Sequence, residues 1–324
     1  MGPRTPVERF AWPFDDNNTY RPSTNVQPAR QRRVTAAGYW GDHILDVDEY
    51  YGETMALRRA ILGADPMRCR FLPHMRAAVW DALLYLLAEL ADSRPHAMHL
   101  FTEGDAVRWR NDLLDERLEF TFGDEASLPV DPWTLLFRQV QEDVVLLDER
   151  GGHLYVDAIA STFSGMWSNT FALGMSFDDV HGPVPRIHLD GTVSRTERFL
   201  MSLRPGDDYR RVSWAIADGR FDMSLEGYSE WPVDHWAPIR ERGAYGEAVL
   251  RVEVQHTIRL PASGAILFLI RTHMCPLADI AAVPEWLAQL TSVVTELPQD
   301  LVHDKGYAPI RDGLVGWLNA ATAK

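Results

Sequence analysis

The chain has 324 residues, of which 46% are hydrophobic and 10% aromatic, so it could form one large domain or two small ones. Its formal net charge of −14 argues against a general nucleic-acid binder or a binder of anionic membranes, because both need a basic face. The two cysteines, Cys69 and Cys275, are too few for a disulfide framework or a four-thiolate metal site, and they suit a reducing compartment.

No stretch of the chain is typical of a targeting or membrane segment. The first residues lack the apolar core of a signal peptide, and no run approaches the 18 apolar residues of a transmembrane helix. We therefore expect a cytoplasmic protein with no membrane or nucleic-acid partner. The one dense basic run, residues 30–33, lies among Pro and Asn residues and is interpreted as a solvated loop.

The first half of the chain is predicted to be mainly helical. Aromatic residues at 10–14 and 20–22 interrupt a polar N-terminal segment, which we expect to lie on the body of the protein. Apolar residues at three- and four-residue steps predict helices over 46–62, 74–90 and 131–147. Arg58 and Arg59 are expected to face outward from the first of these helices. Residues 100–130 are mixed and charged, and could hold a short strand or helix.

The second half is predicted to be mainly β-structure. A strand is expected at 153–160, and an antiparallel hairpin at 250–260 and 265–272. Residues 219–247 are rich in turns and are interpreted as a long loop. Two helices, at about 284–297 and 310–320, end the chain. The fold class is therefore α+β, as a single domain over 1–324 with a mainly helical part (1–150), a β core (151–280) and C-terminal helices (281–324).

Residues 180–185, Val-His-Gly-Pro-Val-Pro, indicate a site at His181. Each proline fixes its own φ and restricts its predecessor, so we expect an extended, rigid corner that orients the imidazole. An oriented histidine suits metal ligation or proton transfer, although a histidine that only caps a Pro-rich turn would look the same. His188 and His256 are the second and third candidates for a metal ligand.

The strand at 250–260 carries polar residues on one face. Arg251, Glu253 and Gln255 alternate with apolar residues, so we expect the three side chains to lie together. Glu253 could pair with an ammonium group or accept its proton. The alternative is a structural ion pair with Arg251, Arg259 or Arg271.

Several of these motifs occur in the same order in a known family, and the chain resembles the haem-dependent oxidative N-demethylases. The matching residues are Gln141-Glu142-Asp143, Trp167, Val180 to Pro185, Arg211, Trp214, Arg251, Glu253, Gln255, Leu260-Pro261, Phe268 and Ile270-Arg271-Thr272. The resemblance implies a PAS-like antiparallel sheet with surrounding helices that holds haem b. It also implies His181 as the axial iron ligand, and Arg271, Arg211, Trp167 and Trp214 as residues around the cofactor.

The implied activity is oxidative dealkylation, or a related oxidation, of a small amine by O₂. Glu253, Arg251 and Gln255 would then be the catalytic residues. The sequence has no flavin or iron–sulfur motif, so electrons would come from a separate flavin or iron–sulfur reductase. The alternatives are a haem PAS-type sensor of O₂ or redox state, and a haem-free scaffold protein.

Two departures from the family pattern leave the substrate open. Residues 161–166 lack the Pro-Ser turn of the family, and Ser213 replaces an Asn. Cys275, followed by a proline, could be read as a thiolate ligand, but we interpret it as a small buried residue. Two histidines and two aspartates at 178–188 could form a mononuclear metal site, although the prolines between them do not give the usual ligand spacing.

Overall fold

The computed structural model describes residues 2–14, 25–188 and 191–323. Its main feature is an antiparallel sheet in the order β1-β10-β11-β12-β8-β9-β4. The strands are β1 (Gln27–Pro28), β4 (Cys69–Phe71), β8 (Asp143–Arg150), β9 (His153–Ala160), β10 (Tyr209–Ala217), β11 (Val249–Arg259) and β12 (Ile266–Pro276). A short hairpin, β2 (Arg33–Val34) and β3 (Tyr39–Trp40), lies apart from this sheet. The expected combination of helices with an antiparallel sheet is confirmed.

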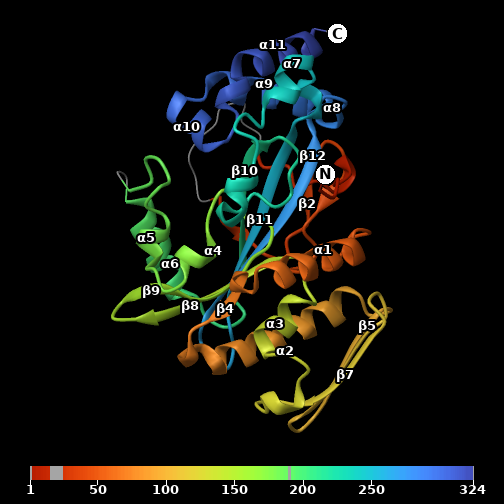
Figure 1. The fold of residues 1–324 in the computed structure, drawn as a ribbon, viewed down its shortest axis with the longest axis vertical. Helices are drawn as coiled ribbons and strands as arrows, with labels where there is room; N and C mark the ends of the chain where they lie inside the picture. Colours follow the sequence, from red (N-terminus) through yellow and green to blue (C-terminus); the bar gives the residue numbers. More distant parts are fainter. Residues whose placement is uncertain (1, 15–24, 189–190, 324) are drawn as a thin grey trace.

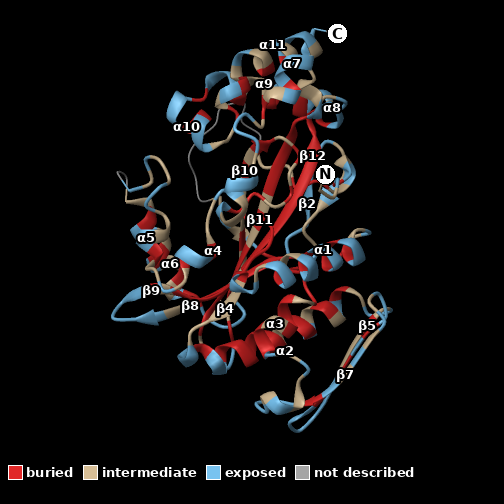
Figure 2. Cartoon of the chain, in the orientation of Figure 1, coloured by how far each residue is buried: buried red, intermediate tan, exposed pale blue. Residues whose placement is uncertain are grey.

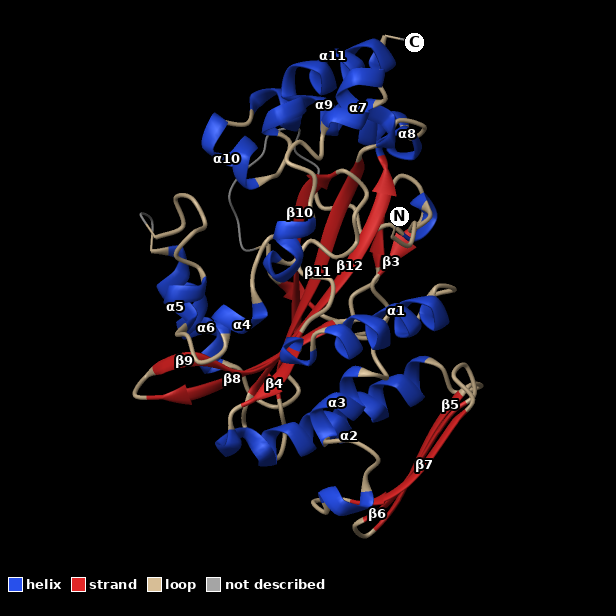
Figure 3. Cartoon of the chain, viewed as in Figure 1, coloured by secondary structure: helices blue, strands red, loops and turns tan. Residues whose placement is uncertain are grey.

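Helices gather at both ends of the long strands (Figure 3). They are α1 (Tyr51–Ala64), α2 (Arg76–Ser93), α3 (Pro132–Phe137), α4 (Asn169–Ala172), α5 (Phe177–Val180), α6 (Thr192–Ser202), α7 (Ala237–Arg242), α8 (Leu277–Ile280), α9 (Pro284–Glu296), α10 (Gln299–Asp304) and α11 (Arg311–Thr322). In Figure 1 the C-terminal helices cover one end of β11 and β12, and α2 and α3 lie at the other. The helices expected near 46–62, 74–90, 284–297 and 310–320 are confirmed with shifted ends. Within the described part of the chain, no helix is both long and apolar enough to cross a membrane.

The helix predicted over 131–147 is wrong beyond its first two turns. It begins as expected, because the Asp131 side chain accepts from the N–H groups of Trp133 and Thr134 and a proline occupies the first turn. It ends at Phe137, and β8 begins at Asp143. Residues 144–147 are a continuous apolar run, which is typical of a strand with neighbours on both sides; β8 pairs with both β9 and β12.

The region left open at 100–130 forms a second sheet. It contains β5 (Met98–Glu103), β6 (Ala106–Asn111) and β7 (Glu116–Thr121), joined by two tight turns. In Figure 2 most of this sheet is exposed, in contrast to the buried β11 and β12. This sheet and β8 both lie in the part expected to be mainly helical.

The N-terminal segment packs on the body of the protein, as expected. Phe10 is fully buried, and Trp12 stacks on Trp286 of α9 with ring centroids 4.5 Å apart. The aromatic residues expected at 20–22 lie outside the described residues.

Strands β10, β11 and β12 present two different faces, and the predicted alternation in β11 is confirmed. One face carries Val252, Val254 and Trp214, and an apolar cluster with the C-terminal helices buries most of it. We call this the closed face. On the opposite face, the described residues form one apolar cluster at each end, one around Phe163 and Phe221 and one around α5 and α6.

Candidate active site

Between those two apolar clusters lies a group of polar side chains, which we call the polar centre. Its members, from three adjacent strands, are Arg211, Ser213, Glu253, Gln255 and Thr272. Ser213 and Thr272 are the register partners of Glu253 on its two sides, and Arg211 is the partner of Gln255. Residues paired across an antiparallel sheet point to the same face, so the strand register itself brings these side chains together.

Glu253 is held by its two neighbours on the same strand. Gln255 Nε2 donates to Glu253 Oε2 at 3.0 Å, and Arg251 Nη2 lies 3.7 Å from Glu253 Oε1. The predicted trio is therefore close together. The Glu253 side chain keeps 17% of its surface exposed, whereas Arg251 keeps only 2%. Glu253 thus forms the ion pair with Arg251 that was the structural alternative, and it stays partly exposed.

Arg251 is fixed by backbone groups from two loops. Its guanidinium donates to the carbonyl oxygen of Phe221 at 2.8 Å, to that of Phe163, and to Thr272 Oγ1 at 3.2 Å. Burial lowers the pKa of Arg251, and the nearby Glu253 carboxylate opposes that shift. Arg251 therefore ties the two loops to the sheet beside Glu253.

One of these loops, residues 161–167, passes directly over Glu253. A Cβ atom at Gly165 would come within 2.9 Å of Glu253 Oε1, so this position requires the close approach that glycine permits. Met166 follows with φ of +66°, a conformation rare for residues with a side chain. The loop also pairs with residues 223–225, because the N–H of Met223 donates to Ser164 O at 3.1 Å. The departure from the family pattern at 161–166 thus falls on a loop that covers the polar centre.

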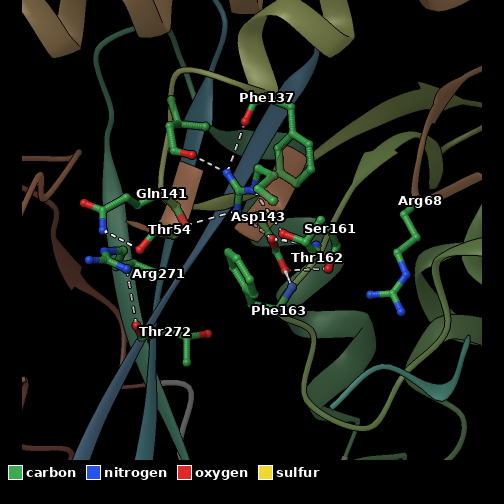
Figure 4. Close-up of polar contacts among 12 residues, drawn as sticks. Thr54, Arg68, Phe137, Gln141, Asp143, Ser161, Thr162, Phe163, Arg271 and Thr272 are labelled. Carbon is green, nitrogen blue, oxygen red and sulfur yellow. Dashed lines mark hydrogen bonds and ion pairs between the residues drawn. The ribbon is translucent and has the colours of Figure 1, made fainter. Parts of the chain in front are cut away.

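A buried network fixes the start of this loop (Figure 4). Asp143 accepts from the N–H groups of Thr162 and Phe163, each at 3.0 Å, and from the Ser161 hydroxyl. Arg58 pairs with Asp143 at 3.0 Å and bonds to Thr162 Oγ1 at the same distance. Burial raises the pKa of Asp143 and lowers that of Arg58 to about 10, although each charge opposes the shift of the other.

The sequence did not reveal this network. Arg58 was expected to face outward with Arg59, but it is fully buried while Arg59 is exposed. The Arg58 guanidinium also donates to the carbonyl oxygens of Phe137 and Gln141, each at 3.2 Å. These two residues lie at the two ends of the turn between α3 and β8. One signal in the sequence could have revealed it. Residues 141–143 are polar and lead directly into an apolar strand, so their carboxylates are expected to be buried, and a buried carboxylate needs a cationic or hydrogen-bonding partner.

His181 lies at the C-terminal end of α5. Its Nδ1 is 2.7 Å from the carbonyl oxygen of Phe177, and its ring packs on the Phe177 ring. Burial lowers the pKa of His181, the hydrogen bond to Phe177 opposes this, and the positive charge of Arg211 lowers it further. The imidazole is therefore neutral near pH 7 and donates through Nδ1, which leaves Nε2 with a lone pair.

The proline corner itself differs from the prediction. It is not extended but consists of consecutive turns, in which the N–H of Val184 donates to His181 O at 3.1 Å. The orientation of His181 comes from the helix before it, through the Phe177 carbonyl. His188 is exposed, and its Nε2 lies 3.0 Å from His181 O. The His188 Nδ1 lies 3.5 Å from Asp178 Oδ1, so the two ring nitrogens of His188 contact both sides of this turn and stabilise it.

Two of the expected cofactor residues, Arg211 and Trp167, lie on the side of the sheet opposite the closed face. Arg211 belongs to the polar centre and is close enough to His181 to affect its pKa. Trp167, at the end of the 161–167 loop, is partly buried against the apolar cluster that includes Phe177. Arg211 is thus near both Gln255 and His181, and Trp167 belongs to the same apolar cluster as Phe177.

The other two lie on the closed face. Arg271 is the register partner of Val254, and its guanidinium pairs with Asp48 at 2.6 Å. Trp214 packs edge-on against Phe14, with centroids 5.1 Å apart, inside the C-terminal cluster. The structure does not bring these two residues together with Glu253.

His256 also lies on the closed face. It is almost fully buried, and neither ring nitrogen has a hydrogen-bond partner among the described residues. Burial lowers its pKa to about 3, and nearby Arg210 adds to the effect. Cys275 is fully buried there as well, as expected, and burial raises the pKa of its thiol to about 12. A thiol with this pKa is not a ready thiolate ligand.

One group of possible metal ligands lies elsewhere. His74, Asp148 and Asp157 have ligand atoms within 4.8 Å of one another. Arg150 pairs with both carboxylates, at 2.9 Å for Asp148. Its guanidinium therefore occupies the position of positive charge that a metal ion would take. The histidines and aspartates at 178–188 do not form such a group within the described ranges.

A comparison with known protein families gives one match. The family described as haem-dependent oxidative N-demethylase, alpha subunit-like, matches residues 35–315. The matched range includes the Arg58–Asp143 network, the 161–167 loop, His181 and the complete polar centre.

Proposed function

Because the chain belongs to the haem-dependent oxidative N-demethylase, alpha subunit-like family, we propose that it is a haem-dependent oxygenase that dealkylates a small amine. The family supports an oxidoreductase role and haem as the cofactor. The proposal further includes haem b, a PAS-like character of the central sheet, O₂ as oxidant and a separate reductase as electron donor. When bound, haem would supply the oxidation of the carbon next to the amine nitrogen.

The observation that carries the proposal is the state of His181. A histidine that holds haem iron binds it as a neutral imidazole, and its second nitrogen is commonly fixed by a hydrogen bond. His181 meets both conditions, through its lowered pKa and the 2.7 Å contact between Nδ1 and Phe177 O. Nε2 would therefore hold the iron, and Arg211 would pair with a propionate, since a guanidinium suits a carboxylate.

The polar centre would hold the amine. Glu253 offers a carboxylate that is fixed by Gln255 on Oε2 and approached by Arg251 at Oε1. An ammonium group would pair with this carboxylate, and the proton lost from nitrogen would move to Glu253 Oε1. Phe163 and Trp167, from the covering loop, would exclude water from the same space.

The first experiment tests the ligand. The protein is produced with haem precursor, and the visible spectrum of His181→Ala is compared with that of the unchanged protein and of His188→Ala. We expect a Soret band in the unchanged protein and in His188→Ala, and its loss in His181→Ala. A Soret band that persists unchanged in His181→Ala would refute the assignment, and a protein that never binds haem would refute the function.

A second experiment tests Glu253. A set of secondary amines is offered with O₂, a reductase and its reduced nicotinamide, and aldehyde release is measured. We expect Glu253→Gln, which keeps the size of the side chain, to lower the rate by about 10²-fold while the Soret band stays unchanged. Equal rates in the two proteins would exclude Glu253 from catalysis. Haem binding without any aldehyde release would favour a sensor.

A further inference from the structure

The small sheet β5–β7 has one buried and one free face. Val107, Trp109 and Phe120 point inward and belong to the apolar cluster formed with α1 and α2. Along β6 the alternation is strict, so Arg108 and Arg110 point outward and are exposed. The sheet projects from the end of the molecule opposite the C-terminal helices (Figure 1). Its outer face is therefore open to a partner.

Strand register arranges the outer side chains in two rows. Phe101, Arg108 and Glu119 form one row across the three strands, and His99, Arg110 and Arg117 form the next. Phe101 keeps 56% of its surface exposed, which is unusual for a phenylalanine, and the Arg108 guanidinium lies 5.9 Å from its ring centroid. The outer face thus combines an aromatic side chain with three guanidinium groups.

Two of these guanidinium groups form no ion pair among the residues that the structure describes. Arg110 is held by Asp112 through two contacts of 2.6 and 2.5 Å. Arg108 and Arg117 form no such ion pair, although Glu119 lies opposite Arg108 in register and Arg117 is near enough to Asp112 to lower the pKa of that carboxyl. In a chain with a net charge of −14, two cations left unpaired beside an exposed aromatic ring indicate a binding surface.

The surface is also hollowed. A shallow, open concavity of about 270 Å³ is lined by outer residues (Phe101, Arg108, Arg110, Arg117, Glu119) together with Trp109 and Leu118 from the inner side of the sheet. Adjacent rows of a sheet lie about 6.7 Å apart along the strand, which is also the spacing of alternate side chains in an extended peptide. An extended segment that crosses the sheet diagonally could therefore place an apolar side chain against Phe101 while its acidic residues meet Arg108, in the same row, and Arg117, in the next row.

We propose that the outer face of β5–β7 binds an extended acidic segment of another protein, through carboxylates on Arg108 and Arg117 and an apolar side chain on Phe101. Nucleic acid carries a negative charge at every phosphate along its length and would also meet the acidic surface around this face, whereas a short acidic segment contacts only the local cations. This surface is on a different sheet from the polar centre, and the proposal does not depend on the proposed function.

The test uses synthetic eight-residue peptides with fluorescent labels, built from two copies of Phe-Ser-Glu-Ser (the Glu-Phe peptide), Ala-Ser-Glu-Ser (the Glu-Ala peptide) or Phe-Ser-Lys-Ser (the Lys-Phe peptide). In an extended chain this spacing puts the charged and apolar side chains on the same face. Binding is measured by fluorescence anisotropy with the full chain at low and high salt. We expect the Glu-Phe peptide to bind best, and its binding to weaken as salt rises. Equal binding of the Glu-Phe and Lys-Phe peptides would overturn the proposal.

Matched double variants locate the site. Arg108→Glu with Arg117→Glu should weaken binding of the Glu-Phe peptide about tenfold or more. Arg204→Glu with Arg242→Glu changes the net charge equally at exposed positions elsewhere and should leave binding unchanged. In Phe101→Ser, the affinity for the Glu-Phe peptide should fall to the affinity that the unchanged protein has for the Glu-Ala peptide. Equal losses in both double variants would mean general charge attraction and would refute the site. Thermal unfolding of each variant shows that the fold is retained.

Discussion

The two faces of the β10–β12 sheet contain the same kinds of polar residue, but these residues differ in how deeply they are buried and in the partners they have. On the closed face, Arg271 is fully paired with Asp48, and His256 is buried without a partner. On the other face, Arg251 fixes Glu253, which stays partly exposed. The same kinds of side chain are therefore buried in the core on one face and partly exposed on the other.

The largest difference between the faces should appear when one partner of each ion pair is removed. Asp48→Ala leaves the buried Arg271 charge uncompensated, and it also removes the acceptor of Gln141 Nε2. We expect the free energy of unfolding to fall by about 3–5 kcal/mol. Glu253→Ala should cost about 1 kcal/mol or less, because water can reach this site. Urea denaturation of the two variants measures the difference, and equal losses would contradict the comparison.

A second difference should appear as acid sensitivity. The pKa of His256 is about 3 in the folded protein, below its ordinary value of 6.5 in the unfolded chain. The unfolded state therefore binds a proton that the folded state does not, so stability is complete above pH 6.5 and is lost as pH falls toward 3. Between pH 7 and pH 5, His256 should account for about 2 kcal/mol of lost stability.

The variant His256→Phe isolates this contribution. It should lose about 2 kcal/mol less than the unchanged protein between pH 7 and pH 5, measured by urea denaturation at both values. The exposed His188→Phe serves as the control, with no change in this pH dependence. If His256→Phe retains the full acid sensitivity, the buried imidazole is not its source.

The smallest effect concerns the loop over the polar centre. Gly165→Ala would bring a Cβ within 2.9 Å of Glu253 Oε1, so the carboxylate must shift. We expect a loss of roughly 1 kcal/mol in stability and weaker binding of amines, with an unchanged Soret band. Gly52→Ala, at a helical position with open space around it, should not destabilise the protein. Amine affinity in Gly165→Ala equal to that of the unchanged protein would separate the loop from the site.

Sequence patterns predicted the local elements well where one periodicity dominated. The hairpin of β11 and β12 followed from strict alternation, and so did the common side of Arg251, Glu253 and Gln255. The pattern predicted one long helix at 131–147, because the apolar residues of a short helix are followed, after a turn, by the apolar residues of a strand. It gave no clear signal for β5–β7 as a whole, because only β6 alternates strictly, whereas burial along β5 and β7 is irregular.

The amino-acid sequence by itself determined the mixed fold class, the family and the polar trio on β11, because each depends on residues close together along the chain. The tertiary structure alone decided which side of the sheet each distant residue faces. Pairing with Val254 puts Arg271 on the closed face, and pairing with Gln255 puts Arg211 beside Glu253. The burial of Arg58 against Asp143, 85 residues away, was equally hidden. Side-chain alternation fixes faces within a strand, but only the register between strands fixes them across a sheet.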